Sequence, residues 1–258
     1  MWTTRLSRPA VVGHARAKRL VESALRFEDS IALSEAVARD RNGIGFIGLP
    51  YVRDAKAIAI SEGNSSPLLP NSLTVGTEDY LLSRRLYLYT TSTSQNPWTK
   101  KFIEFALSNE GQRIVGESGF IAQTVKAESS AIAAKAPGEY KRLTEGAERL
   151  SLNLRFRRGG KDLDNKARLD LDRVVNFISD LKFTGQNILL FGFADDGVGN
   201  EVNLELSKER AQLVAEQFKR RGLTPLVVTG FGDSIPVASS LTEEGKEKNR
   251  RVELWLKK

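Results

Sequence analysis

Asp195 and Arg210 are the two residues whose types and positions could do chemistry together. Asp195 follows the apolar run NILLFGF (187–193), and Arg210 lies in the periodic segment that ends at Gly222. A guanidinium holds a carboxylate through two parallel hydrogen bonds, and an aspartate attracts an ammonium group. The pair could therefore bind a zwitterion beside the free amides of a helix start. Alternatively, it forms a structural ion pair that ties a loop to a helix.

The helical period places Arg210 on the inward side of its helix. With Leu206 at 0°, the apolar residues Leu213, Val214 and Phe218 fall at roughly 340°, 80° and 120°. Arg210 falls at about 40° on the same wheel, inside this apolar arc. A buried guanidinium needs an acceptor, because an unpaired buried charge is costly. Asp195, at the end of the preceding strand, is the natural candidate.

Other chemistries lack the residues that they require. The chain has no cysteine and a single histidine, His14, without any partner motif. Disulfides, thiolate catalysis, a histidine-based metal site and a catalytic triad are therefore not expected. No nucleophile is paired with a base, so we predict no enzyme, no catalytic residue, no metal and no cofactor. His14 is expected to be a surface residue.

The composition suits a folded globular protein with anionic partners. Hydrophobic residues make up 40% and charged residues 28% of the chain, and the net charge is +7. This charge favours nucleic acid, anionic lipid or an acidic wall polymer in general, but no nucleic-acid-binding motif is present. We find neither a transmembrane segment nor a secretory signal peptide in the sequence.

The elements that must position Asp195 and Arg210 lie in the second half of the chain. Strand-like and helical patterns alternate there in the order β-α-β-α-β-(short helix)-β, which predicts an α/β (α+β) domain with helices packed on one mixed sheet. The predicted strands are 150–156, 187–193, 226–232 and 251–257, and the long helices are 163–181 and 202–221.

The first half is less regular. Residues 27–40 and 96–120 predict helices, 43–52 a buried strand or a close-packed turn, and 84–91 a strand. The Ala-, Ser- and Pro-containing stretch 125–147 is predicted to be a linker. These boundaries divide the chain into domains 1–124 and 148–258.

The second half resembles the OmpA C-terminal domain, which also occurs in peptidoglycan-associated lipoproteins and flagellar stator proteins. The resemblance covers about 148–258. It is carried by the strand-end Asp195, by NLELSKERA with Asn203 and Arg210, by the GFG…P pattern at 230–236 and by NRRVE at 249–253.

This resemblance implies non-covalent binding of peptidoglycan. By position, Asp195 and Arg210 would hold the amino and carboxyl ends of the diaminopimelate side chain in the stem peptide. Asn203 and either Arg250 or Arg251 would support them, with strand alternation allowing only one of the two arginines to face the site. Asn203 has an equal alternative as a helix cap or first-turn residue.

The sequence departs from the family pattern in two places. Phe193 and Ala194 stand where a polar pair usually precedes the aspartate, so a hydroxyl donor is missing. The segment 156–160 reads FRRGG instead of the usual acidic sequence. Both changes concern affinity and fine specificity more than the fold.

Residues 27–122 resemble the latter portion of the phosphate-binding proteins of ABC importers, which are periplasmic binding proteins of type II. The resemblance is carried by ALSEAVARDRNGIGFIGLPYVRDAKAIAI, YLLSRRLYLYT and FIEFALSNEGQRIVGESGFI. It implies a partial substrate-binding domain with two lobes, but the phosphate ligands of that family have no match here. We therefore predict no phosphate-binding residue.

The leading hypothesis is a peptidoglycan-binding module that tethers a substrate-binding-like domain in the periplasm or cell envelope of a Gram-negative bacterium. In the alternative, the first half captures phosphate or another anion and the second half is its wall anchor. We expect the sequence to be the distal part of a longer fusion protein.

Overall fold

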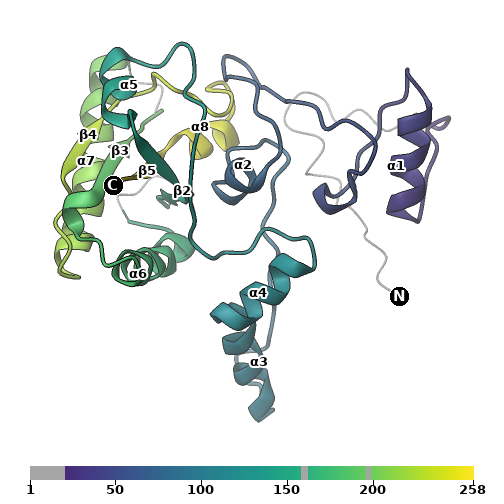
Figure 1. Ribbon diagram of the computed structural model, residues 1–258, viewed down its shortest axis with the longest axis horizontal. Helices are drawn as coiled ribbons and strands as arrows, with labels where there is room; N and C mark the ends of the chain where they lie inside the picture. The colour runs from purple at the N-terminus through teal and green to yellow at the C-terminus, as the bar shows by residue number, and fades with distance from the viewer. Residues whose placement is uncertain (1–20, 158–161, 196–198) are drawn as a thin grey trace.

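The computed structural model describes residues 21–157, 162–195 and 199–258, so His14 lies outside the described residues. Its main element is a five-stranded mixed sheet with the strand order β1-β2-β5-β3-β4 (Figure 1). The parallel pair is β3 with β4, and the pairs β1–β2, β2–β5 and β3–β5 are antiparallel. The strands are β1 (Ala127–Glu128), β2 (Ala147–Arg155), β3 (Ile188–Gly192), β4 (Val227–Gly230) and β5 (Arg251–Lys257).

Two helices cover one face of this sheet. They are α6 (Asn165–Asp180), whose start is capped by the side chain of Asp164, and α7 (Asn200–Lys219). Alternate residues of β2 and β5 point toward these helices, as the period of two along a strand requires. The resulting core includes Leu150, Leu152, Leu154, Val252, Leu254, Leu256, Leu171, Val174, Ile178, Val214 and Phe218. The predicted mixed sheet with packed helices is confirmed.

The opposite face of the sheet carries an aromatic cluster under the short helix α5 (Gly138–Thr144). The ring of Tyr140 meets Phe231 and Trp255 edge-on, with centroids 5.2 and 5.9 Å apart. Its hydroxyl donates to Glu253 Oε2 at 2.7 Å, so the one polar atom of this buried ring has a partner. Phe191 and Phe193 complete the cluster.

The segment 125–147, expected to be a linker, contributes β1 and α5 to the packed domain. Val125 belongs to the core on the helical face, and Tyr140 to the cluster on the other face. The low aromatic content of this stretch suggested a linker. It nevertheless contains these two residues, whose side chains are buried. β2 also begins at Ala147, a few residues before the predicted strand.

A piece of the first half lies on the same face as α5. Beyond α2 (Ser72–Gly76), the carboxylate of Asp79 is buried and accepts hydrogen bonds from Arg149 and Asn153, each at 2.8 Å. Arg155 Nη2 lies 3.3 Å from Asp79 Oδ1, the oxygen atom that also accepts from Asn153. Burial alone would raise the pKa of Asp79, but Arg149, Arg251 and Arg155 outweigh burial and hold this pKa below its ordinary value.

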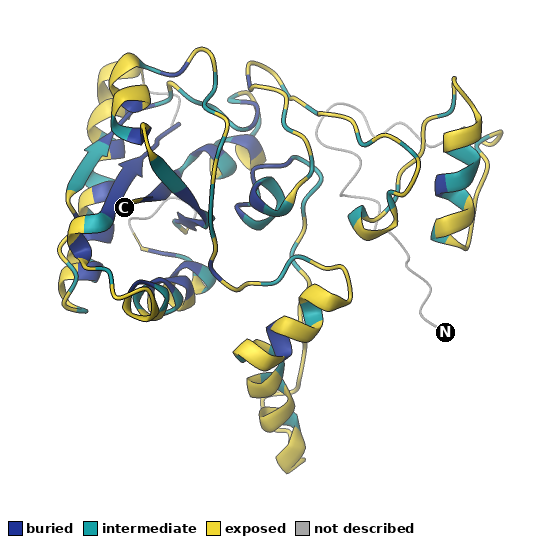
Figure 2. Ribbon diagram, viewed as in Figure 1, coloured by how far each residue is buried: buried dark blue, intermediate teal, exposed yellow. Residues whose placement is uncertain are grey.

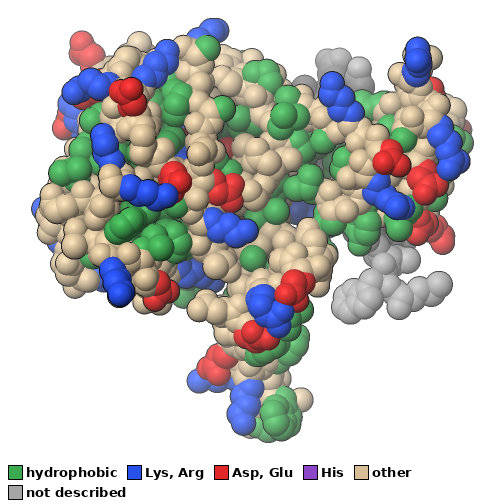
Figure 3. Space-filling view, in the orientation of Figure 1, with side chains coloured by type: hydrophobic (Ala, Val, Ile, Leu, Met, Phe, Trp, Pro, Cys, Tyr) green, Lys and Arg blue, Asp and Glu red, His purple; other side chains and the backbone are tan. Residues whose placement is uncertain are grey.

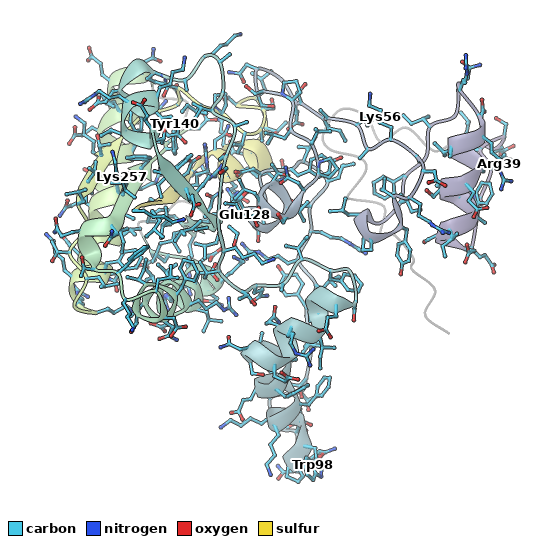
Figure 4. All side chains as sticks on the ribbon, viewed as in Figure 1. Arg39, Lys56, Trp98, Glu128, Tyr140 and Lys257 are labelled. Atoms are coloured by element: carbon cyan, nitrogen blue, oxygen red, sulfur yellow. The ribbon has the colours of Figure 1, made fainter. Side chains whose placement is uncertain are left out.

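The remaining elements of the first half stand apart from the sheet. They are α1 (Ser30–Arg39), the 3₁₀ turn η1 (Leu49–Tyr51), α3 (Pro97–Leu107) and α4 (Asn109–Glu117). The predicted helices 27–40 and 96–120 are thus confirmed. α3 and α4 form an arm that projects from the body and is largely exposed (Figure 2), with Trp98 at its tip (Figure 4). Hydrophobic side chains lie along this arm (Figure 3).

The strand predicted at 84–91 is wrong. This segment has no strand partner, and Tyr87 and Tyr89 are 63% and 89% exposed. Residues 43–52 do not form a strand either and end in η1, which agrees with the turn alternative. Within 21–124, the described β contacts comprise one isolated bridge, Ile60 with Leu68. The lobes that the resemblance to binding proteins implies are therefore not shown. None of the helices in the described ranges has the length and apolar content to cross a membrane.

Candidate functional site

One edge of the sheet brings four chain segments together. β3 and β4 run parallel with Gly192 opposite Gly230, so both carboxyl ends reach this edge. The ladder continues beyond the strands, because Ala194 N donates to Gly232 O at 2.9 Å. The antiparallel strands complete the edge: β2 ends there at Arg155, opposite Arg251, the first residue of β5. Asp195 follows β3 directly at this edge.

Two glycines let α7 approach the strand ends closely. A Cβ atom on Gly192 would lie 1.9 Å from the carbonyl oxygen of Ser207, and one on Gly230 would lie 2.2 Å from the hydroxyl oxygen of Ser207. Only glycine leaves room for the helix at these positions. The hydroxyl of Ser207 also accepts from Gly232 N at 2.9 Å, which fixes the helix to the loop after β4.

Asp195 is 3% exposed and is held by Asn249. Asn249 Nδ2 donates to Asp195 Oδ2 at 2.6 Å and to Ala238 O at 3.0 Å. Its Oδ1 accepts from Val237 N at 2.8 Å and from Ala238 N at 3.0 Å. Asn249 ends α8 (Glu243–Asn249), so this helix and the loop before it determine how the carboxylate of Asp195 is presented.

Arg210 lies on the flank of the buried stripe of α7, not inside it. The buried side chains Asn203, Ser207, Ala211, Val214 and Phe218 centre at about 100° on the wheel used above, while Arg210 stays at about 40°. Leu206 and Leu213, on which the predicted apolar arc was based, are only half-buried. The buried face of α7 therefore lies farther from Arg210 than the predicted arc.

The guanidinium of Arg210 contacts an aromatic ring at the same sheet edge. Its central carbon lies 5.8 Å from the ring centroid of Phe156, the residue that follows β2. Arg210 has further interactions, but the ion pairs between described residues do not include one with Asp195. Asp195 and Arg210 thus reach the same edge from different elements without forming the structural ion pair that was one of the two alternatives.

Asn203 is buried in the first part of α7. Its Nδ2 donates to Asp233 Oδ2 at 3.1 Å, which joins the helix to the loop after β4. The N-cap of α7 is Gly199, and Asn203 is the fourth residue of the helix, so Asn203 is a first-turn residue and not the cap. The two arginines of the NRRVE motif belong to different elements, because Arg250 is the C-cap of α8 and Arg251 begins β5.

Arg251 is 1% exposed and belongs to the face with the aromatic cluster. Its Nη2 and Nε donate to Glu253 Oε1 at 2.7 and 3.0 Å, and its guanidinium carbon lies 4.0 Å from the ring centroid of Phe193. Arg250 is half-buried and caps α8 by donating its backbone N–H to Lys246 O at 2.9 Å. Arg251 is therefore occupied within the sheet.

Phe193 and Ala194 are each 1% exposed, and Phe193 packs in the aromatic cluster. The apolar pair before Asp195 therefore serves the core. Sequence reasoning singled out Asp195 and Arg210 by residue type and Asn203 through the family resemblance, but assigned no role to Asn249, although the NRRVE motif contains it. A buried amide with four hydrogen bonds cannot be recognised from spacing alone.

Residues 155–250 match the model of the OmpA family. The peptidoglycan-associated lipoprotein of Pseudomonas aeruginosa is 33% identical over 112 residues, covering 43% of this chain and 65% of that protein. The peptidoglycan-binding protein ArfA of Mycobacterium bovis is 36% identical over 69 residues, covering 26% of this chain and 21% of that protein. The chain thus spans less than two thirds of the length of either relative.

Among solved structures, the cell wall anchor of the T6SS from Pseudomonas aeruginosa has a TM-score of 0.38 and 21% sequence identity, covering 56% of this chain and 94% of that one.

Proposed function

We propose, on the premise that residues 155–250 form an OmpA-like domain, that this domain binds peptidoglycan non-covalently and tethers the rest of the chain to the cell wall. The names of the two relatives, a peptidoglycan-associated lipoprotein and a peptidoglycan-binding protein, support this proposal. The observation that supports it is that Asp195 follows β3 at the sheet edge where Phe156 follows β2, and that Arg210 of α7 lies 5.8 Å from the ring centroid of Phe156.

In this proposal the ligand is the diaminopimelate side chain of the stem peptide. Asp195 meets its ammonium group and Arg210 its carboxylate, so the two charged ends of a zwitterion are matched by two opposite charges. Arg250 supports the same ligand, and Asn203 acts through Asp233 by holding the loop after β4. We assign Arg251 to the sheet, because its donors are directed to Glu253.

In this proposal Asn249 holds the carboxylate of Asp195 in place before a ligand binds. The carboxylate of Asp195 is nearly buried, and Asn249 Nδ2 donates to it at 2.6 Å, which fixes its orientation. Because the amide of Asn249 is itself fixed by three backbone hydrogen bonds, the carboxylate does not have to be ordered when a ligand arrives.

The role of the first half rests on its resemblance to substrate-binding proteins of ABC importers. We propose that it is the module tethered to the wall, in the periplasm or cell envelope. Capture of phosphate by this half is the competing proposal. It predicts tight, stoichiometric heat exchange with inorganic phosphate in calorimetry. A basic protein that only attracts anions gives a weak signal that disappears in salt.

Removal of the charged groups tests the peptidoglycan site. Arg210→Ala should weaken co-sedimentation with purified peptidoglycan about ten- to a hundredfold, the effect of losing a charge-assisted contact of roughly 1.5–3 kcal/mol. Arg210→Lys should restore little, because an ammonium cannot form the planar two-bond contact. Asp195→Asn should abolish retention as well.

Arg220→Ala is the matched control, because Arg220 is exposed at the other end of the same helix. This variant should sediment like the wild type. Thermal melts of all variants show whether each is folded. Folded Arg210→Ala and Asp195→Asn proteins that still sediment like the wild type would contradict the proposed site.

A further inference from the structure

A segment of the first half contacts the end of α8, the helix whose last residue positions Asp195. Lys248, next to Asn249, donates from Nζ to the carbonyl oxygens of Leu81 at 3.1 Å and Tyr80 at 3.4 Å. These contacts join parts of the chain that are far apart in sequence. They place residues 80–81 directly against the helix end.

Arg155 makes a second link between the same two regions. Its Nη2 donates to Thr77 O at 3.0 Å, and its Nη1 donates to the carbonyl oxygens of Glu247 and Lys248. The guanidinium therefore bridges the first half to the last turn of α8. Asp79 lies 3.3 Å from the same Nη2 and supplies the negative charge that this buried arginine needs.

A third link holds the loop before α8. Ser239 N donates to Glu62 Oε2 at 3.2 Å. Gly63, at φ +60°, lies so close to this loop that a Cβ atom on it would be 3.0 Å from the hydroxyl oxygen of Ser239. The neighbouring amides of Val237 and Ala238 are the two that donate to Asn249 Oδ1. The first half therefore fixes both the loop and the helix end that orient Asn249.

We infer that residues 62–81 are a positioning element of the peptidoglycan site, acting through Lys248 and the loop at Ser239 on Asn249 and thus on Asp195. The inference rests on the proposed function. These residues lie outside the match to the OmpA family, which begins at residue 155, so this support comes from the first half of the chain. We call residues 62–81 the brace. Occupation of the site and docking of this segment are then linked, and each stabilises the other.

Lys248→Met tests the brace, because it removes the donors to Tyr80 and Leu81 while keeping an unbranched stem. The full chain should bind soluble diaminopimelate-containing peptidoglycan fragments about two- to thirtyfold more weakly, the range for coupling through positioning residues. Lys248→Arg should restore binding, since a guanidinium also donates to carbonyl groups. Lys246→Met is the matched control, because Lys246 lies on the same helix and pairs with the surface residue Glu243.

The side-chain amide resonances of Asn249 in ¹H–¹⁵N spectra report positioning without any ligand. They should shift in Lys248→Met, return in Lys248→Arg and stay unchanged in Lys246→Met. If Lys248→Met does not fold, Glu62→Ala decides, because it removes the carboxylate that accepts from Ser239 N while Lys248 stays in place, and it should shift the same resonances. Wild-type resonances and wild-type affinity in a folded brace variant would overturn the inference. Absence of binding by the wild type would overturn the proposed function instead, while the resonance shifts would still test the brace.

Discussion

At the scale of single residues, the sheet buries two carboxylates that share one arginine. Asp79 and Glu253 are 2% and 1% exposed and share Arg149, which lies 2.8 Å from Asp79 and 3.2 Å from Glu253. Burial opposes the charge of Glu253, but Arg149 and Arg251 lower its pKa below the ordinary value of 4.5. The network is therefore most stable when both carboxylates are ionised.

Asp79→Asn should destabilise the protein by about 3–5 kcal/mol at neutral pH, because it leaves buried arginines without their counter-charge. The acid dependence should change as well. A carboxylate with a lowered pKa contributes stability that is complete above its ordinary pKa, 3.8 for Asp79, and is lost as the pH falls through the lower folded value. Urea denaturation from pH 7 to pH 2 should show a smaller loss of stability in the variant, with the remainder due to Glu253. Equal acid dependence in both proteins would contradict the assignment.

The residues that could be predicted from the sequence were those with a distinctive type at a strand end or in a helix. Asp195 and Arg210 are such residues. Asp79 and Asn249 are not, because their roles arise from contacts with partners 70 and 54 residues away. The inward position of Arg210 was overestimated because the wheel was centred on Leu206. The buried stripe through Ser207 is the side of α7 that faces the sheet.

At the scale of elements, the site depends on how closely α7 lies to the strand ends. Gly192→Ala should push the helix outward, because the added Cβ would meet the carbonyl oxygen of Ser207. We expect a loss of about 1–3 kcal/mol or more in unfolding free energy and weaker wall binding, measured by urea denaturation and co-sedimentation. Gly138→Ala is the control, since nothing lies within 4 Å of its Cβ position, and it should be neutral or slightly stabilising. Equal stability of the two variants would show that α7 adjusts without cost.

Element types followed from periodicity wherever an element has a partner. The helices α6 and α7 bury one face each, whereas β3 and β5 are covered on both faces, and this burial imposes the helical period and the apolar runs that the sequence displays. Residues 84–91 show the limit of this reasoning. Their aromatic and β-branched composition suits a strand, but a strand needs a neighbour for its backbone hydrogen bonds, and composition does not show whether one exists.

At the scale of the whole molecule, we expect the stable unit to begin before residue 148, because residues of the segment 125–147 pack against the sheet. A fragment starting at residue 148 lacks β1, Val125 and Tyr140. We expect unfolding free energy to decrease from the full chain to 125–258 and again to 148–258. Loss of Tyr140 alone should cost about 3–5 kcal/mol, as for other large aromatic core residues.

Denaturation of the three proteins, followed by circular dichroism, measures this order. Limited proteolysis of the full chain gives an independent result, since the first cuts should fall in the exposed segment 84–96. Release of a stable fragment that begins at 148 would restore the linker interpretation of 125–147. Composition alone suggested that linker, because a few buried residues within a polar stretch hardly change its average character.

The order of the strands also constrains when the domain can fold. β5, the last element of the chain, lies between β2 and β3 and pairs with both. Without it, the sheet would consist of two separate pairs, β1 with β2 and β3 with β4. During synthesis the chain must therefore be completed through residue 257 before a continuous sheet can form. β2 must wait for β5, which follows about a hundred residues later, and such a long-range closure slows folding. Until that moment β2 and β3 each lack a neighbouring strand, so folding of the sheet is timed by the arrival of β5.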